Sequence, residues 1–149
     1  MKVIGNLHIL GQKSIIKMNT SPANNLDYSG WVSDEFVDED VTVGQALYFD
    51  ITTQRWKLAK ANSKDTMPAR ALALENIGAG GICRLLRNGT IRLDSQNFNK
   101  QFIYVSDTTA GELVLDPPTT TGSIIQQIGT PVRNNTAWFD FNSFTKTVD

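Results

Sequence analysis

Cysteine and histidine are nearly absent from this 149-residue chain, which contains one of each. A single cysteine, Cys83, excludes an intrachain disulfide framework, and one Cys with one His cannot supply the ligands of a structural zinc site. Because Cys83 lies inside an apolar run, we expect a buried, inert thiol rather than a reactive one. The lone histidine, His8, lies near the start of the chain, where a catalytic base would be poorly held.

Long apolar runs and a basic excess are also missing. No run approaches the roughly 18 apolar residues of a membrane span, and the start, MKVIGNLHIL, lacks the pattern of a secretory signal peptide. We therefore expect a protein that is neither membrane-spanning nor exported by that route. The net charge of −1 argues against a nucleic-acid partner, since such proteins carry a basic contact face.

No set of residues in the sequence converges on a chemical reaction. The run DEFVDED at 34–40 lacks the Asp-x-Asp-x-Asp-Gly order of a calcium loop, and IGAGG at 77–81 lacks the Lys-Ser/Thr of a phosphate-binding loop. We expect no catalytic, cofactor-binding or metal-binding residues and predict that the protein is not an enzyme. A deep pocket that holds a carboxyl group with a shifted pKa would contradict this prediction.

The charges that are present are unevenly distributed. Residues 31–50 hold six acids and no Lys or Arg, whereas residues 51–110 hold nine bases and four acids. Such asymmetry is compatible with head-to-tail contacts between copies of the chain, and equally with a solvated acidic turn.

Composition and pattern together predict a folded β protein. Hydrophobic residues make up 40% and charged residues 19% of the chain, as in one folded domain with or without an arm. Short runs of β-branched and aromatic residues separated by turn formers predict strands. The runs at 46–49 and 55–58 predict a hairpin, and a turn at 134–135 predicts entry into a final strand.

The predicted fold class is all-β: a compact antiparallel β-barrel or sandwich with an extended N-terminal arm. We place the arm and linker at residues 1–40 and the domain at residues 41–149.

The predicted arm contains candidate contact residues. Alternating apolar positions predict short strands within residues 1–20, and such strands need a partner to cover their edges. Residues 21–34 are rich in Ser, Pro, Asn and Gly and predict a loop. A tryptophan in this loop either plugs the core or lies in an interface. The residues that we expect to contact a partner or a neighbouring subunit are Val3, Leu7, Ile9, Ile15 and Trp31.

The centre of the chain, residues 69–93, predicts a meander of buried strands. Residues 69–74 form a small apolar run that favours a strand buried on both faces; a helix is the alternative, since Ala and Leu favour helices. Asn88-Gly89 between apolar runs predicts a hairpin turn. The glycines that we expect to set structural turns are Gly44, Gly78, Gly80, Gly81, Gly89, Gly111, Gly122 and Gly129.

A weak internal repeat relates two parts of the domain. Tyr48-Phe49 with Thr52-Thr53 forms one pattern, and Tyr104-Val105 with Thr108-Thr109 forms a similar one later in the chain. Each is followed by a strand, a Pro-containing loop and a further apolar strand. An internal duplication and the general likeness of one hairpin to another are both compatible with this pattern.

The most specific motifs of the domain are IYVSD at 103–107 running into Gly111, and PPTTTGSIIQ at 117–126 followed by Gly129. Together with VGQALYFD at 43–50 and PARALALE at 68–75, they resemble a β-rich module of tailed-bacteriophage virion proteins. That group includes capsid decoration, head-fibre and tail-fibre proteins. The resemblance covers roughly residues 40–141 and leaves the predicted arm outside it.

The resemblance implies a structural bead on a virion surface, made in the host cytoplasm, usually as a homotrimer or symmetric cluster and without a cofactor. We expect a capsid decoration protein, of the cementing or head-fibre kind, with the major capsid protein and other copies of the chain as partners. Its N-terminal segment would add a strand to one of these partners. The alternative is a tail-fibre or receptor-binding module that recognises a host-surface glycan through exposed aromatics such as Trp31, Trp56 or Trp138.

Overall fold

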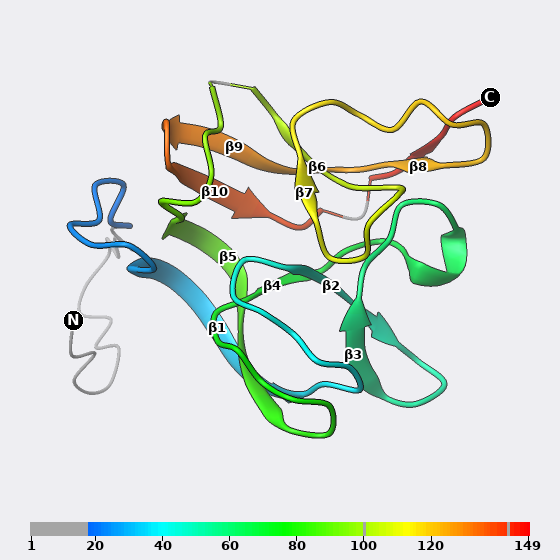
Figure 1. Ribbon diagram of the computed structural model, residues 1–149, viewed down its shortest axis with the longest axis horizontal. Helices are drawn as coiled ribbons and strands as arrows, with labels where there is room; N and C mark the ends of the chain where they lie inside the picture. The colour runs from blue at the N-terminus through cyan, green and yellow to red at the C-terminus, as the bar shows by residue number, and fades with distance from the viewer. Residues whose placement is uncertain (1–17, 100, 143) are drawn as a thin grey trace, which may run out of the picture.

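The computed structural model describes residues 18–99, 101–142 and 144–149, whose regular secondary structure consists of β-strands except for one short 3-10 helix (Figure 1). The strands are β1 (Tyr28–Phe36), β2 (Ala46–Asp50), β3 (Arg55–Leu58), β4 (Ala71–Ala73), β5 (Ile82–Arg92), β6 (Ile103–Val105), β7 (Leu113–Val114), β8 (Ile124–Ile125), β9 (Gln127–Arg133), β10 (Thr136–Asp140) and β11 (Lys146–Thr147). The described residues contain no α-helix and one short 3-10 helix at Lys64–Thr66. No helix among them is long and apolar enough to cross a membrane. The predicted all-β class is confirmed.

One antiparallel sheet of nine strands forms the body of the protein. Its order is β3-β2-β4-β5-β10-β9-β6-β7, with β1 paired to β5 as well, while β8 and β11 form a separate small sheet. The two halves of this order match. Each begins with a hairpin (β2–β3 or β6–β7), continues with a strand that pairs with the first strand of that hairpin (β4 or β9), and ends in a central strand (β5 or β10). The predicted duplication agrees with this order and stays a prediction.

The first half of the sheet curls into a half-barrel. β1 and β3 lie at the two ends of the run β1-β5-β4-β2-β3, and just past β1 the residue Val37 forms a parallel bridge with Trp56 of β3. A small apolar cluster fills the inside. Its members are Val37, Val41, Leu47, Trp56, Ala71, Ala73, Cys83 and Leu85. The predicted buried thiol of Cys83 is confirmed, since its side chain belongs to this cluster and is fully buried.

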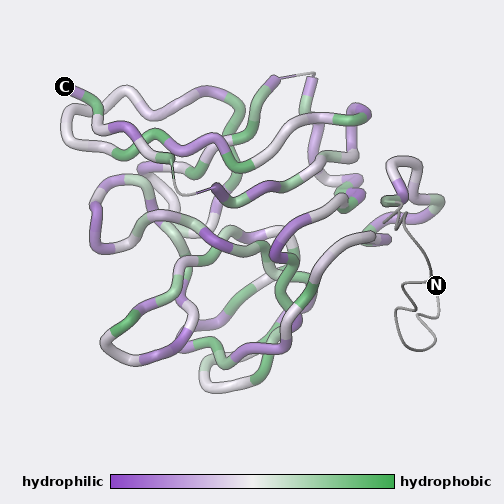
Figure 2. The backbone as a smooth tube through the Cα atoms, turned by 180° about the vertical axis from the view of Figure 1, so that it is seen from behind, coloured by the Kyte–Doolittle hydropathy of each residue, from purple (hydrophilic) through white to green (hydrophobic). Residues whose placement is uncertain are grey.

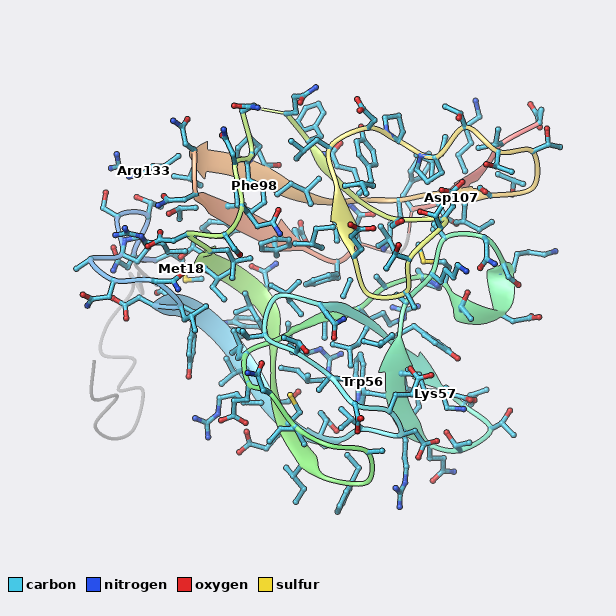
Figure 3. The ribbon with its side chains drawn as sticks, in the orientation of Figure 1. Met18, Trp56, Lys57, Phe98, Asp107 and Arg133 are labelled. Carbon is cyan, nitrogen blue, oxygen red and sulfur yellow. The ribbon has the colours of Figure 1, made fainter. Side chains whose placement is uncertain are left out.

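β4 is buried on both faces. Ala71 and Ala73 face the half-barrel, whereas Leu72 packs into a larger cluster that also contains residues of the second half, and all three are fully buried. The strand predicted within residues 69–74 is therefore confirmed, and the helix alternative is wrong. Figure 3 shows Phe98 of the larger cluster in the upper half of the view and Trp56 of the smaller one in the lower half.

Strand alternation, rather than a long apolar segment, builds both clusters. Seen from behind, hydrophobic and hydrophilic stretches follow one another at short intervals along the chain (Figure 2). Successive strand residues point to opposite faces, so alternating stretches place one set in a core and the other outside.

Asn88-Gly89 does not form the predicted turn. Both residues lie inside β5, which continues unbroken from Ile82 to Arg92 and pairs with β1 and β10. The local turn preference is overridden because both neighbouring strands supply hydrogen-bonding partners. Gly129 likewise lies inside β9 rather than in a turn, and a Cβ there would come within 3.0 Å of Ile103.

The remaining glycines of the predicted set lie in or beside turns. Positive φ angles of 89°, 83°, 77° and 86° occur at Gly44, Gly80, Gly111 and Gly122. Gly78 and Gly81 bracket the turn at Gly80, and the N–H of Gly81 donates to the carbonyl of Gly78 at 3.0 Å. This turn links β4 to β5 and does not hold a phosphate-binding helix.

The N-terminal region differs from the prediction. Residues 21–34 are predicted as a loop, but β1 begins at Tyr28 and pairs with β5 along all nine of its residues. The frequent Ser and Gly residues of this region mask a strand that tertiary pairing stabilises. The candidate contact residues Val3, Leu7, Ile9 and Ile15 lie outside the described residues.

Candidate interaction surface

An apolar strip lies exposed on the outer face of the two paired strands β1 and β5. Its members, which we call the β1–β5 strip, are Tyr28, Val32, Phe36 and Ile82, and their exposed fractions are 37, 42, 52 and 54%. Phe36 is paired in register with Ile82, so the strip continues from one strand to the next. Clustered exposed apolar side chains of this kind mark interaction sites more often than single ones do.

The strip results from strand alternation around a buried interior. In β5, Cys83 and Leu85 face the inside of the half-barrel and are fully buried. The residues next to them, Ile82 and Arg84, therefore face outward together with their partners in β1. Sequence reasoning missed this strip, although the apolar residues at every fourth position from Tyr28 were a usable signal for one face of a strand.

A charged pair stands in the middle of the strip. Arg84 Nε lies 3.0 Å from Asp34 Oδ1, and the two residues line a groove of about 370 Å³ with Tyr28 and Val32. The Asp34 carboxylate, and next to it the Tyr28 phenol, raise the pKa of Arg84 above its usual range. The surface thus combines apolar side chains with a permanent, locally balanced ion pair.

Trp31 lies on the opposite face of β1 and does not plug the core. Its side chain is 65% exposed, and the register between β1 and β5 shifts directly after it. The core-plug interpretation is therefore wrong, and the interface interpretation remains. Of the other tryptophans, Trp56 is buried in the half-barrel and Trp138 is half-buried.

β1 also has an edge that is not paired. The strand pairs with β5, and in the described part of the chain no other strand pairs with it; only Val37, past its end, bridges to Trp56. Alternate N–H and C=O groups of an antiparallel strand point away from its partner, so those of β1 face outward along this edge. Such an edge can accept an extended chain by main-chain hydrogen bonding.

Part of the acidity of residues 31–50 is neutralised within the subunit. Asp38 lies 3.4 Å from Arg55 and 3.7 Å from Lys57, and Asp50 lies 2.7 Å from Lys57. Glu35 lies 3.8 Å from Arg87, whose guanidinium stacks over the Trp56 ring at 4.6 Å. The uneven charge distribution in the sequence therefore supports contacts inside one copy, which neither of the two sequence interpretations anticipated.

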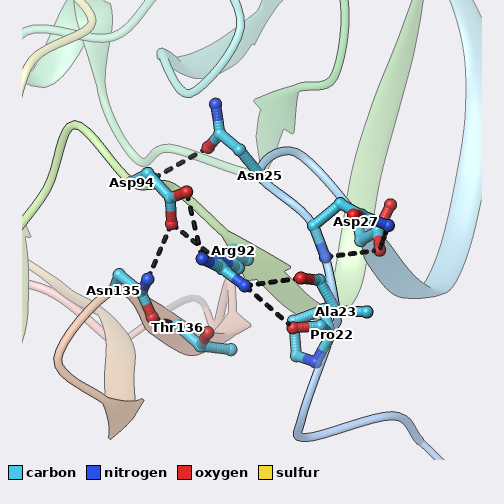
Figure 4. A network of polar contacts seen from close by, with 9 residues as sticks. Pro22, Ala23, Asn25, Asp27, Arg92, Asp94, Asn135 and Thr136 are labelled. Carbon is cyan, nitrogen blue, oxygen red and sulfur yellow. Dashed lines mark hydrogen bonds and ion pairs between the residues drawn. The ribbon is translucent and has the colours of Figure 1, made fainter.

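The chain leading into β1 is fastened where the two halves of the sheet meet. Arg92 of β5 donates to the carbonyls of Ala23 and Pro22 at 2.7 and 3.4 Å, and its Nε lies 2.6 Å from Asp94 Oδ1 (Figure 4). Asn135, in the turn between β9 and β10, donates to the same carboxylate oxygen at 2.6 Å. This network fixes residues 22–27 against the body.

Residues 19–21 are held by a second set of contacts. The Asn19 carbonyl accepts from Thr90 Oγ1 at 2.5 Å, and its N–H donates to Ser29 Oγ at 3.1 Å. Arg133, at the end of β9, donates to the Thr20 carbonyl at 3.3 Å and also to Ser21 Oγ; Figure 3 shows it beside this segment. The chain thus enters the body at a fixed point beside the start of β1.

A larger hollow of about 520 Å³ lies at the other end of the molecule, beside β6 and β7. Asp107 and Asp116 line it, and Ser123 Oγ donates to Asp107 at 3.0 Å. Within the described ranges no three His, Cys, Asp or Glu side chains come together as a metal site would need. The hollow therefore offers carboxylate acceptors and no identifiable reaction chemistry.

Comparisons with known proteins do not add a relative: no family model matches the chain, no curated protein matches its sequence, and no solved structure matches its fold.

Proposed function

We propose that this chain is a virion structural protein that decorates the outside of a phage head, bound to the major capsid protein. The observation that carries the proposal is the β1–β5 strip beside the unpaired edge of β1. Four large apolar side chains on one outward face stabilise a subunit little and are well suited to contact another protein. The motifs that resemble phage virion modules support the same class.

The construction of the body supports a role as a rigid bead. Two matched halves share the central pair β5 and β10, and both clusters of buried side chains run through strands of that sheet. We propose a homotrimer as the assembled form, because symmetric closure protects edges such as that of β1 and gives avidity on a symmetric lattice.

The test is the location of the protein in purified particles. Heads and tails of the encoding phage are separated, and quantitative mass spectrometry measures the ratio of this chain to the major capsid protein. We expect a fixed ratio in heads and none of the chain in tails. Recovery with isolated tails and absence from heads would show that the proposal is wrong.

A binding assay tests whether the strip is the attachment surface. Heads that lack this protein are mixed with purified wild-type chain or with Phe36→Ser, and bound protein is measured after sedimentation. Loss of a central apolar contact is expected to weaken binding about 10-fold or more. The matched control is Ile51→Ser in the β2–β3 turn, a large apolar residue that is 82% exposed and is not a member of the strip; it should bind as the wild type does.

The tail-fibre alternative is kept because one observation favours it. Trp31 is 65% exposed, and an exposed aromatic ring is a common platform for sugars. A glycan array with purified protein tests it, with Trp31→Ala as the control. Binding that depends on Trp31, together with recovery in tails, would favour receptor recognition.

A further inference from the structure

We propose that residues 1–17 of a second copy flank the β1–β5 strip by adding a strand to the edge of β1 with which no described strand pairs. This inference names the partner of the surface described above, and it rests on the proposed function only in expecting copies to cluster.

The N-terminal segment and the part of the chain around β1 carry opposite charges. Residues 1–17 contain three lysines and no Asp or Glu, whereas residues 18–54, which include all of β1, contain seven acids and no Lys or Arg. Four of these acids are paired with bases of the body. Among the described residues, Asp27 just before the strip and Glu39 and Asp40 just after it are in no salt bridge, so acidic groups flank both ends of the strip. A lysine-bearing segment complements these acidic groups, whereas two copies of β1 facing each other would bring acid toward acid.

The N-terminal segment also carries apolar residues at alternating positions. Val3, Leu7 and Ile9 stand at odd positions, and the even positions between them hold Asn6 and His8, with Ile4 as the one apolar exception. In an extended chain these odd positions share one face. That face matches the outward apolar face of β1, whose large apolar members are Tyr28, Val32 and Phe36. Cross-strand apolar pairs of this type stabilise an added strand.

The reach of the segment allows a second copy to supply it. Asn19 is fixed beside Ser29, at the start of β1. The chain from Ile9 to Met18 spans about 30 Å when extended, which equals the length of the nine-residue β1. A segment that extends away from its own body is therefore long enough to bring Val3, Leu7 and Ile9 to another copy. The same three residues can lie along the β1 of a neighbour.

The experiment detects contact between different chains. One chain carries a single cysteine at Val3, Leu7 or Ile9, and a size-tagged chain carries Val32→Cys. The two are co-expressed, purified and treated with a bis-maleimide of about 8 Å span, which joins directly opposed and diagonal strand neighbours. Cys83 is fully buried and serves as a silent background in every variant. Products are resolved by denaturing electrophoresis.

We expect a cross-linked heterodimer with at least one of the three arm variants, at about tenfold the yield of a control pair. In the control pair Ile51→Cys, which is exposed but is not a member of the strip, replaces Val32→Cys. Yields equal to the control for all three variants would overturn the inference. A cross-link found only inside single chains that carry both cysteines would also overturn it, in favour of the chain's own segment.

The outcome is independent of where the protein sits in the particle. A control-level yield with the chain present on heads would remove the strand exchange and leave the decoration role. A high yield with the chain present on tails would support the strand exchange and remove the decoration role.

Discussion

Gly30 of β1 and Gly89 of β5 are paired so closely that neither position has room for a side chain. A Cβ on Gly30 would lie 2.2 Å from the carbonyl oxygen of Asn88, and a Cβ on Gly89 would lie 2.2 Å from that of Ser29. Both residues also have positive φ angles, 155° and 147°. This pair lies close to the register shift between β1 and β5, which falls between Trp31 and Val32.

Replacement of either glycine should therefore destabilise the protein. We expect Gly30→Ala to lower the free energy of unfolding by about 2–4 kcal/mol, because a methyl group meets fixed backbone atoms in a strained conformation. Urea unfolding measures it. Gly122→Ala is the control, since its φ is 86° but nothing lies within 4 Å of the added Cβ; conformation alone should cost about 1 kcal/mol. Equal losses would contradict the close-approach argument.

A buried glutamine joins the two halves of the sheet, and its loss should be costly. Gln126 is 1% exposed; its Oε1 accepts from the N–H of Ala69 at 2.8 Å, and its Nε2 donates to the carbonyls of Ala69 and Asn142 at 3.0 and 2.7 Å. Gln126→Leu leaves these backbone groups buried without partners, and we expect a loss of about 2–4 kcal/mol in urea unfolding.

The adjacent residue supplies the control for this prediction. Gln127 is exposed at the start of β9, so Gln127→Leu should change the free energy of unfolding by no more than about 0.5 kcal/mol. Similar effects of the two substitutions would show that the Gln126 contacts contribute little.

Lysine should not be able to replace Arg92 without loosening the chain that leads into β1. Its guanidinium contacts Asp94 through two nitrogens and reaches two main-chain carbonyls, a geometry that lysine cannot reproduce. We expect Arg92→Lys to speed amide hydrogen exchange in residues 19–27, including the N–H of Leu26, which donates to the Arg92 carbonyl. Arg70→Lys, at an exposed position, should leave that exchange unchanged.

Acid should weaken the fold through two carboxylates with lowered pKa values. The Lys57 ammonium lowers the pKa of Asp50, and the Arg92 guanidinium lowers that of Asp94. A carboxyl group whose pKa is lower in the folded state stabilises the protein above its unfolded pKa of about 4, and this contribution is lost as pH falls through the folded value. We expect the melting temperature to drop as the pH falls from about 4 to 2.

Measuring the melting temperature of a double variant against pH separates the contribution of Asp50 and Asp94 from other effects of acid. Asp50→Asn with Asp94→Asn should lower stability at neutral pH and flatten the loss in acid. Asp116→Asn, at an exposed carboxylate, should leave the slope as it is in the wild type. An unchanged slope in the double variant would contradict the assignment.

Trp31 should respond to solvent and to partners without contributing to stability. Because its side chain is 65% exposed and Trp56 is buried, iodide should quench the fluorescence of the first and spare the second. Trp31→Phe should therefore remove most of the quenchable emission while shifting the free energy of unfolding by no more than about 0.5 kcal/mol. Protection of Trp31 from iodide on assembly would place it within an interface.

The sequence pattern was sufficient to predict several segments of the sheet. The hairpin at 46–58 and the turn into Thr136 combine strand formers with turn residues, so local preference and tertiary contacts agree there. The strand at 71–73 was predicted from its short apolar run, although Ala and Leu favour helices, and burial on both faces decides its conformation. The fold class could therefore be derived from short-range patterns alone.

Pattern failed where a distant strand decides the conformation. Asn88-Gly89 would form a turn in isolation, but Gly30, from a much earlier part of the chain, provides a neighbour without a side chain that fits against Gly89. The same pairing converts the Ser- and Gly-rich segment at Tyr28–Phe36 into β1 and exposes the apolar strip. The spacing of Tyr28, Val32 and Phe36 indicates one face of a strand, but no short-range signal reports that this strand pairs with β5, so the candidate surface as a whole emerged only from the structure.

The contacts around Asn19 also determine how the protein would carry a mechanical load. If the N-terminal segment is the tether, tension enters the body at residues 19–27, which are bonded to Thr90 and Arg92 of β5 and to Arg133 of β9. The pull is then divided between both halves of the sheet at once. A force that would peel a single edge strand one hydrogen bond at a time must here displace the central strands together, and the bead should detach from its anchor before it unfolds.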